Sequence, residues 1–145
     1  MQKRIATGIV LGVLICFQAI ADDKGGEYPI ASALGGEEFG GKLNSGIRLF
    51  FGDQPYPVPK ASSGEVTASG RTRAFNISEA EACESAFQEA VLSLQKKAVS
   101  QGNNAAVDIV SMADGEPYSN DGQYYCNVGL MTVVVALKAT LVSLP

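Results

Sequence analysis

The sequence predicts an α+β fold in which a small antiparallel sheet of about four strands packs against one long helix. Apolar side chains recur at helical spacing over residues 79–101. Segments 47–51, 65–75, 105–112 and 123–142 are instead rich in β-branched and aromatic residues, which is typical of strands. One helix covering one face of one sheet is the economical packing for these elements.

The N-terminus has the pattern of a secretory signal peptide. Lys3 and Arg4 precede the uncharged apolar stretch 5–20, and Ala19 and Ala21 are the small residues that a signal peptidase reads. We expect residues 1–21 to be cleaved. The alternative is a retained anchor, but the apolar run is shorter than the roughly 20 residues that span a bilayer.

Lipidation is not expected, because Cys16 follows Ile15 and lipidation signals place a small residue directly before the cysteine. Cleavage leaves 124 residues, a length that suits one domain. Loss of Lys3 and Arg4 leaves nine basic residues against 15 acidic ones, a net charge of −6. This surface argues against nucleic acid as a partner and against attachment to anionic lipid by charge alone.

The chain after the signal divides into a flexible glycine-rich arm, 22–45, and a single domain, 46–145. Paired glycines in the arm make ordering costly in backbone entropy. A short strand is predicted at 47–51, followed by an extended connector at 53–59 with alternate prolines. The second strand, 65–75, contains Gly70 and is expected to be bulged or at a sheet edge.

The helix is the best-specified element. Ser78 and Glu81 form a capping box, which satisfies free amides of the first turn. Lys96 and Lys97 near the end complement the helix dipole, and Gly102 is a natural terminator. The helix is therefore expected to run from Glu79 to Gln101. Beyond it we expect a strand at 105–112, a polar loop at 113–122, and one long strand or two strands joined at Gly129.

Two cysteines, Cys83 and Cys126, remain after signal cleavage, and a structural disulfide is the simplest reading for an exported domain. A redox-active pair is the alternative, but such pairs usually have Cys-x-x-Cys spacing. The predicted bridge ties the helix to the sheet.

The step from the helix into the following strand resembles a known family. Residues 102–111 resemble the "Gly-Ala-Asn-Ala-Val-Val-Asp-Ile" step of small bacterial exported proteins often labelled "excinuclease ATPase subunit". Residues 125–129 and 135–140 resemble the closing strand of that group, and 81–83 its helix start. The step is more distantly similar to YbjQ-type domains, which carry a heavy-metal-binding label, and to the disulfide-stapled Rcs stress-sensor lipoprotein of the outer membrane. The last resemblance implies a stress-related envelope role.

The residues do not support an ATPase or nuclease. A P-loop needs G-x-x-x-x-G-K-[ST], and the nearest segment, 35–43, has Leu43 in place of the hydroxyl residue and two glutamates facing the phosphates. The chain contains no histidine and no G-x-S-x-G elbow, which lowers the expectation of nucleophilic catalysis. We expect no cofactor.

A weak metal candidate lies in the polar loop, where Asp114, Glu116 and Asp121 supply oxygen ligands of the kind that calcium prefers. The EF-hand spacing is absent, and a solvated hairpin loop is the favoured interpretation, so no metal site is predicted.

Tyr118, Tyr124, Tyr125 and Tyr56 are the best candidates for a partner surface, because aromatic residues are enriched in binding hot spots. About half of such a set on alternating strands should be core. The sequence thus predicts a periplasmic or secreted, non-enzymatic accessory or stress-related module. Its partner would be an envelope protein or a small ligand, and no membrane span would remain after cleavage. The alternative is a small exported metal-binding protein or a histidine-free enzyme.

Overall fold

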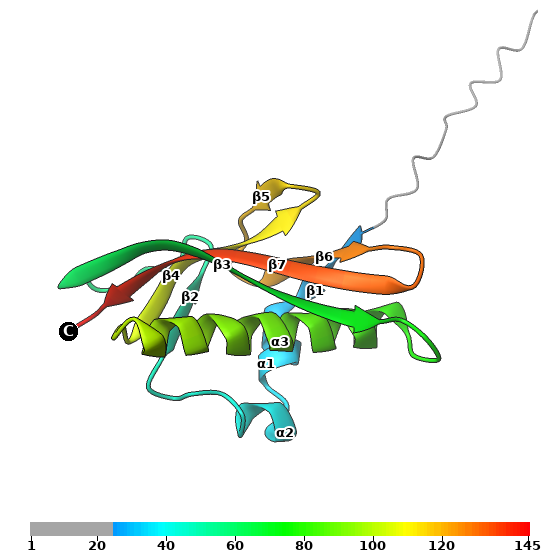
Figure 1. Cartoon of the computed structure of the whole chain (residues 1–145), viewed down its shortest axis with the longest axis horizontal. Helices are drawn as coiled ribbons and strands as arrows, with labels where there is room; N and C mark the ends of the chain where they lie inside the picture. The colour runs from blue at the N-terminus through cyan, green and yellow to red at the C-terminus, as the bar shows by residue number, and fades with distance from the viewer. Residues whose placement is uncertain (1–24) are drawn as a thin grey trace, which may run out of the picture.

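The computed structural model describes residues 25–145 (Figure 1). The predicted signal peptide, with Cys16, lies outside these residues. The described elements, in chain order, are β1 (Gly25–Pro29), α1 (Ile30–Leu34), α2 (Glu37–Gly40), β2 (Arg48–Phe51), β3 (Ala61–Arg73), α3 (Glu79–Ser100), β4 (Ala105–Ala113), β5 (Glu116–Tyr118), β6 (Gln123–Val128) and β7 (Thr132–Ser143).

The sheet has seven strands and is mixed, so the prediction of about four antiparallel strands is wrong. β7 is its centre: β3 pairs along one side of β7, while β6 and β4 share the other side. β1 pairs with β6, and β2 and β5 pair with β4. The β2–β4 ladder is parallel because a long crossover containing β3 and α3 separates these two strands in the chain.

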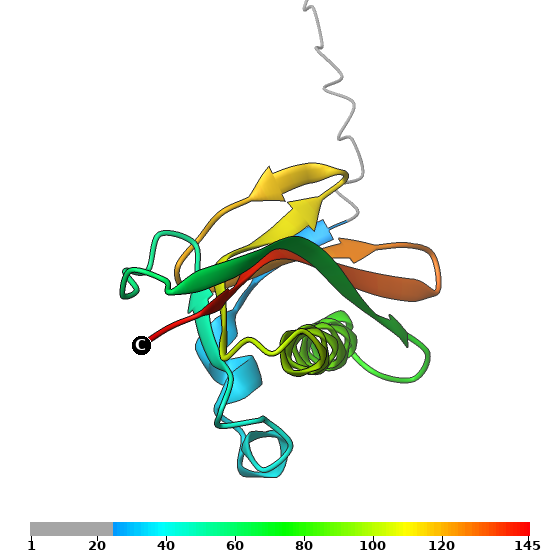
Figure 2. The ribbon, with the colours of Figure 1, turned by 60° about the vertical axis from the view of Figure 1, so that its left-hand side comes forward.

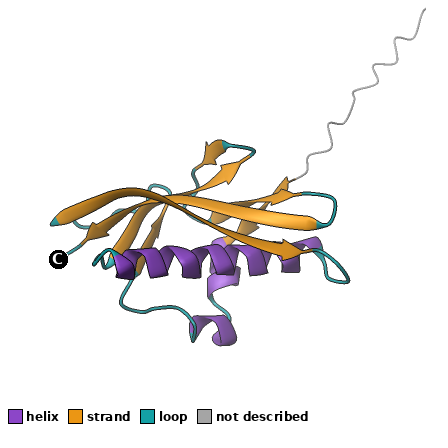
Figure 3. Cartoon of the chain, viewed as in Figure 1, coloured by secondary structure: helices purple, strands orange, loops and turns teal. Residues whose placement is uncertain are grey.

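All three helices lie on one face of the sheet, and the sheet curves over α3 (Figures 2 and 3). The predicted helix is confirmed at Glu79–Ser100, and its capping box is confirmed on the serine side, because Ser78 Oγ accepts the Glu81 N–H at 3.1 Å. Its apolar stripe is fully buried and includes Phe87, Val91 and Leu94. This stripe packs on the inward side chains of β7, such as Val135 and Leu137.

The segment predicted as a flexible arm forms part of the fold. β1 pairs with β6 in register from Gly25 opposite Asn127 to Pro29 opposite Gln123. Ile30, Ala33 and Phe39 of the two short helices are buried. Sequence reasoning missed β1 because backbone pairing supplies its main stabilisation, and paired glycines do not prevent such pairing at the end of a sheet.

A second, smaller apolar cluster lies on the opposite face of the sheet. It consists of Ala105, Val107, Val142 and Leu144, with Phe50 and Tyr56 packed against it. The predicted extended connector therefore covers part of this face through Tyr56. Each face has its own core, and the larger one lies beneath α3.

Candidate functional site

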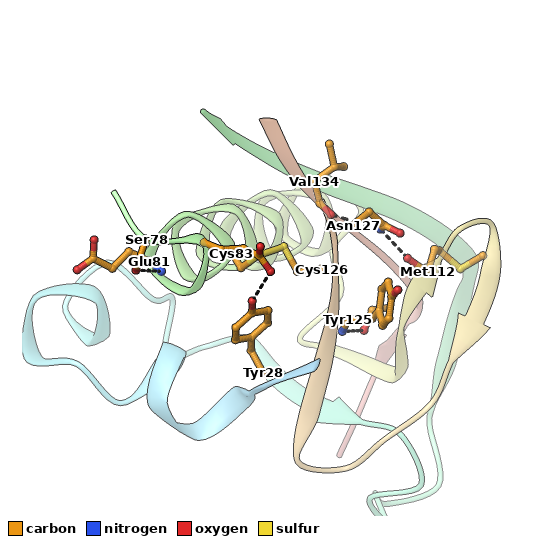
Figure 4. The surroundings of a disulfide bond; sticks show 11 residues. Tyr28, Ser78, Glu81, Cys83, Met112, Tyr125, Cys126, Asn127 and Val134 are labelled. Atoms are coloured by element: carbon orange, nitrogen blue, oxygen red, sulfur yellow. Dashed lines mark hydrogen bonds between the residues drawn. A yellow bond between two sulfur atoms is a disulfide. The ribbon is translucent and has the colours of Figure 1, made fainter. Parts of the chain in front are cut away.

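The disulfide between Cys83 and Cys126 is present, with a Cα–Cα distance of 5.8 Å (Figure 4). It ties α3 to β6, and both cysteines are completely buried. Nearby, the Tyr28 hydroxyl donates to Glu79 Oε1 at 2.8 Å. Redox proteins keep a reactive sulfur accessible, so this bridge is structural.

Tyr124 belongs to the core and not to a partner surface. Its side chain is 2% exposed, and its ring stacks on Phe87 with a centroid distance of 4.0 Å. Burial, the largest cause, raises the pKa of Tyr124, and the Glu84 carboxylate adds to the shift. Tyr124 and Tyr125 are adjacent on one strand, so their side chains take opposite faces of the sheet.

Tyr118 and Tyr125, called the tyrosine pair below, come together on the face without helices. Their ring centroids are 5.9 Å apart, and both side chains are half-buried. The Tyr118 hydroxyl donates to Gln123 Oε1 at 3.3 Å. Partial burial, with the Glu27 carboxylate of β1 as the second cause, raises the pKa of Tyr118. β1, β5 and β6 thus build one site with two aromatic rings and a carboxylate.

Two polar side chains hold the strands around the tyrosine pair where β4 and β6 diverge. Ser111 Oγ accepts the Tyr125 N–H at 2.8 Å. Asn127 donates to the Met112 carbonyl at 2.8 Å and to the Val134 carbonyl at 3.3 Å (Figure 4). Its side-chain oxygen accepts the Asp114 N–H at 2.9 Å. These bonds replace ladder bonds that the fork in the sheet leaves unmade, and they fix the position of Tyr125.

Tyr56 lies apart from the tyrosine pair, on the second apolar cluster. Its hydroxyl donates to Asp108 Oδ2 at 2.9 Å, and that hydrogen bond raises the pKa of Tyr56. Asp108 has a φ of 52°, where β4 shifts register against β7. This contact anchors the proline-rich connector and is a structural role.

The acidic residues of the predicted polar loop do not converge. Glu116 begins β5, so part of the predicted loop is a strand. Asp121 Oδ1 instead accepts the backbone N–H of Asp53 at 2.7 Å. Within residues 25–145, no three acidic or cysteine side chains gather closely enough to hold a metal ion.

A groove of mixed polar and apolar lining lies between α2 and the outer side of α3, and the sequence did not indicate it. Its volume is about 430 Å³, and its lining includes Lys42, Ser85, Gln88, Glu89 and Lys96. Because both lysine and glutamate side chains line the groove, its charge does not favour either an anionic or a cationic ligand. Its side chains are accessible to solvent. It is an open surface groove between two elements.

Sequence reasoning also missed an exposed apolar surface at one end of the molecule. It comprises Phe75, Ile77, Leu130 and Met131, which we call the apolar end; they are 68%, 41%, 96% and 63% exposed. The β3–α3 loop supplies the first two and the β6–β7 turn the others (Figure 1). Leu130-Met131 directly after Gly129 was the available signal, since turns rarely carry two large apolar residues.

No helix among residues 25–145 is long and apolar enough to cross a membrane. No family model, curated protein or solved structure matches this chain.

Proposed function

We propose that this chain is an exported, non-enzymatic accessory module of the bacterial envelope that binds another protein through the tyrosine pair. The observation that carries the proposal is the meeting of Tyr118 and Tyr125 from separate strands, half-exposed, on the face without helices. Tyrosine contributes a large contact area with few rotatable bonds, which is why it is enriched in binding hot spots.

Two features support export to the periplasm or the medium. The signal-like N-terminus carries Lys3, Arg4 and a small-residue cleavage pattern before Asp22. The buried Cys83–Cys126 disulfide is of a kind that persists in oxidising compartments.

The partner is expected to be an envelope protein with a basic or amide side chain for Glu27. Glu27 is exposed beside the tyrosine pair and is paired by backbone register with Tyr125. A carboxylate next to aromatic rings favours partners that present an arginine, which can stack and donate at once. The resemblance to the Rcs stress-sensor lipoprotein supports a stress-related role.

In-cell photo-crosslinking tests the proposal. A photoreactive phenylalanine analogue at Tyr118 is expected to trap a defined envelope protein, whereas the same analogue at Val99, exposed on α3, is not. Purified partner should then bind the wild-type chain at least about tenfold more tightly than the Tyr118→Ala/Tyr125→Ala variant, as expected for a hot spot.

The control variant is Tyr56→Ala, which removes an aromatic ring from the same face at a distance from the pair. Tyr56→Ala should bind the partner as wild type does. If the photoreactive analogue traps the same proteins equally at Tyr118 and at Val99, or if the double variant binds as well as wild type, the tyrosine pair is not the binding site. Capture of a small molecule by Tyr118 without any protein adduct would replace the protein partner with a ligand.

A further inference from the structure

We propose that the apolar end inserts into the interface of a phospholipid bilayer, so that the exported chain works as a peripheral membrane protein. In residues 25–145, six large apolar side chains are exposed, and four of them lie on the two loops of this end. Clustered exposure of this kind marks a binding surface, whereas scattered apolar residues do not.

The two loops of the apolar end are held together by backbone contacts. The Ala74 N–H donates to the Met131 carbonyl at 3.0 Å, which extends the β3–β7 ladder past its last pair, Arg73 and Thr132. The Gly129 N–H donates to the Thr132 carbonyl at 2.8 Å and closes the turn. The two loops are therefore joined at their bases by backbone hydrogen bonds.

The disulfide anchors the bases of both loops. Cys83 lies in α3 shortly after Ile77, and Cys126 lies in β6 shortly before Leu130. A covalent bond between the elements that carry the two loops limits how far the loops can separate, which lowers the ordering cost of insertion.

The shape of the apolar end favours a bilayer over a protein. The two loops project at the extremity of the molecule away from the C-terminus (Figure 1). The four side chains line none of the grooves beside α3. A protein partner would need a matching cavity, whereas a bilayer accepts projecting apolar side chains of any outline.

Two arginines give the apolar end complementarity to lipid phosphates. Arg71 and Arg73 are exposed on the last residues of β3, and Arg73 lies opposite Thr132, next to Met131. Guanidinium groups bind phosphate through paired hydrogen bonds. Three carboxylates lie close to these arginines: Glu89 of α3 accepts the Arg71 backbone N–H at 3.3 Å, and Glu79 and Glu81 follow in the first turn of α3, where Glu79 already accepts the Tyr28 hydroxyl. Insertion of the apolar side chains therefore provides the main attraction to the bilayer, and the arginines orient the protein by binding lipid phosphates.

Leu130→Trp tests insertion directly, because the chain contains no tryptophan and its emission would report this site alone. The disulfide-bonded chain, purified after export, is mixed with vesicles of phosphatidylethanolamine and phosphatidylglycerol. We expect a blue shift and quenching by brominated lipid. Val58→Trp is the matched control, since Val58 is 86% exposed but lies in the proline-rich connector; it should show neither effect.

Sedimentation with the same vesicles gives the affinity. Leu130→Asp should weaken binding by about tenfold or more, because full burial of a large aliphatic side chain is worth that ratio. Tyr118→Ala should leave vesicle binding unchanged, which separates this proposal from the proposed protein partner. No vesicle binding, or equal shifts from Leu130→Trp and Val58→Trp, would overturn the proposal. If the emission of Leu130→Trp shifts to the blue with rising protein concentration in the absence of lipid, the apolar end binds a second copy of the chain. If the blue shift appears only when lipid-free envelope protein is added, the apolar end binds a protein.

Discussion

Gly70 of β3 faces the backbone of Ala86 in α3 so closely that a Cβ atom at position 70 would lie 1.9 Å from the Ala86 carbonyl oxygen. The neighbour is helix backbone, which cannot move aside without moving α3. We expect Gly70→Ala to lower the free energy of unfolding by about 3 kcal/mol, the upper range for overpacking. Urea denaturation measures this value. Gly40→Ala, where no atom lies within 4 Å, is the control and should change stability little.

Removal of the disulfide should destabilise the fold strongly. The bridge closes a loop of 43 residues, and chain entropy assigns such a loop about 4 kcal/mol. Denaturation of Cys83→Ala/Cys126→Ala against the oxidised wild type measures the loss. Since both sulfurs are buried, reductant should expose alkylatable thiols in the wild type only when denaturant is added. Rapid alkylation of the reduced native chain would contradict the buried structural role.

Stability should fall at alkaline pH. Burial, followed by the hydrogen bond to Glu79, raises the pKa of Tyr28 to about 12, and burial raises the pKa of Tyr124 further. Unfolded tyrosines lose their protons near pH 10. The contribution of these groups is therefore complete below about pH 10 and is lost as the pH rises through 12. Thermal unfolding across this range should show the decline, and Tyr28→Phe should make it shallower. An identical slope in the variant would exclude Tyr28 as a cause.

The free edge of β3 is covered by side chains of α3, and removing them should promote association. The Arg71 N–H donates to Glu89 Oε2 at 3.3 Å, and Lys97 Nζ donates to the Thr67 carbonyl. An uncovered edge is a template for pairing with another chain. Glu89→Ala/Lys97→Ala should therefore shift sedimentation toward oligomers, whereas Lys96→Ala, exposed on the same helix, should remain as wild type. Equal behaviour of the two variants would show that α3 does not protect the edge.

The helix could be predicted from the sequence because its signals lie within one segment of the chain. The disulfide could be predicted because only two cysteines remain after the predicted cleavage. The capping box and apolar stripe define α3 without reference to the sheet, and two remaining cysteines leave one pairing. The sheet was harder, because β1 carries little side-chain signal and the β2–β4 pairing joins segments separated by a crossover.

The candidate site shows the same division. Alternation requires that Tyr124 and Tyr125 take opposite faces, but it does not indicate which of them faces α3. The meeting of Tyr118 with Tyr125 depends on the fork at Ser111 and Asn127, and this fork has no counterpart in a linear pattern. The apolar end combines two loops that are distant in the chain, and neither loop alone indicates a surface.

The place of β7 in the sheet sets an order of assembly. This strand contacts β3, β4 and β6, yet it is the last of the described strands in the chain. Until β7 pairs, each of those three strands has an unpaired edge, and α3 lacks the central strand of the sheet on which it packs. Such dependence on late, non-local pairing is typical of slow folding. Under the export proposed above, such a delay would keep the chain unfolded until its final strand had crossed the membrane.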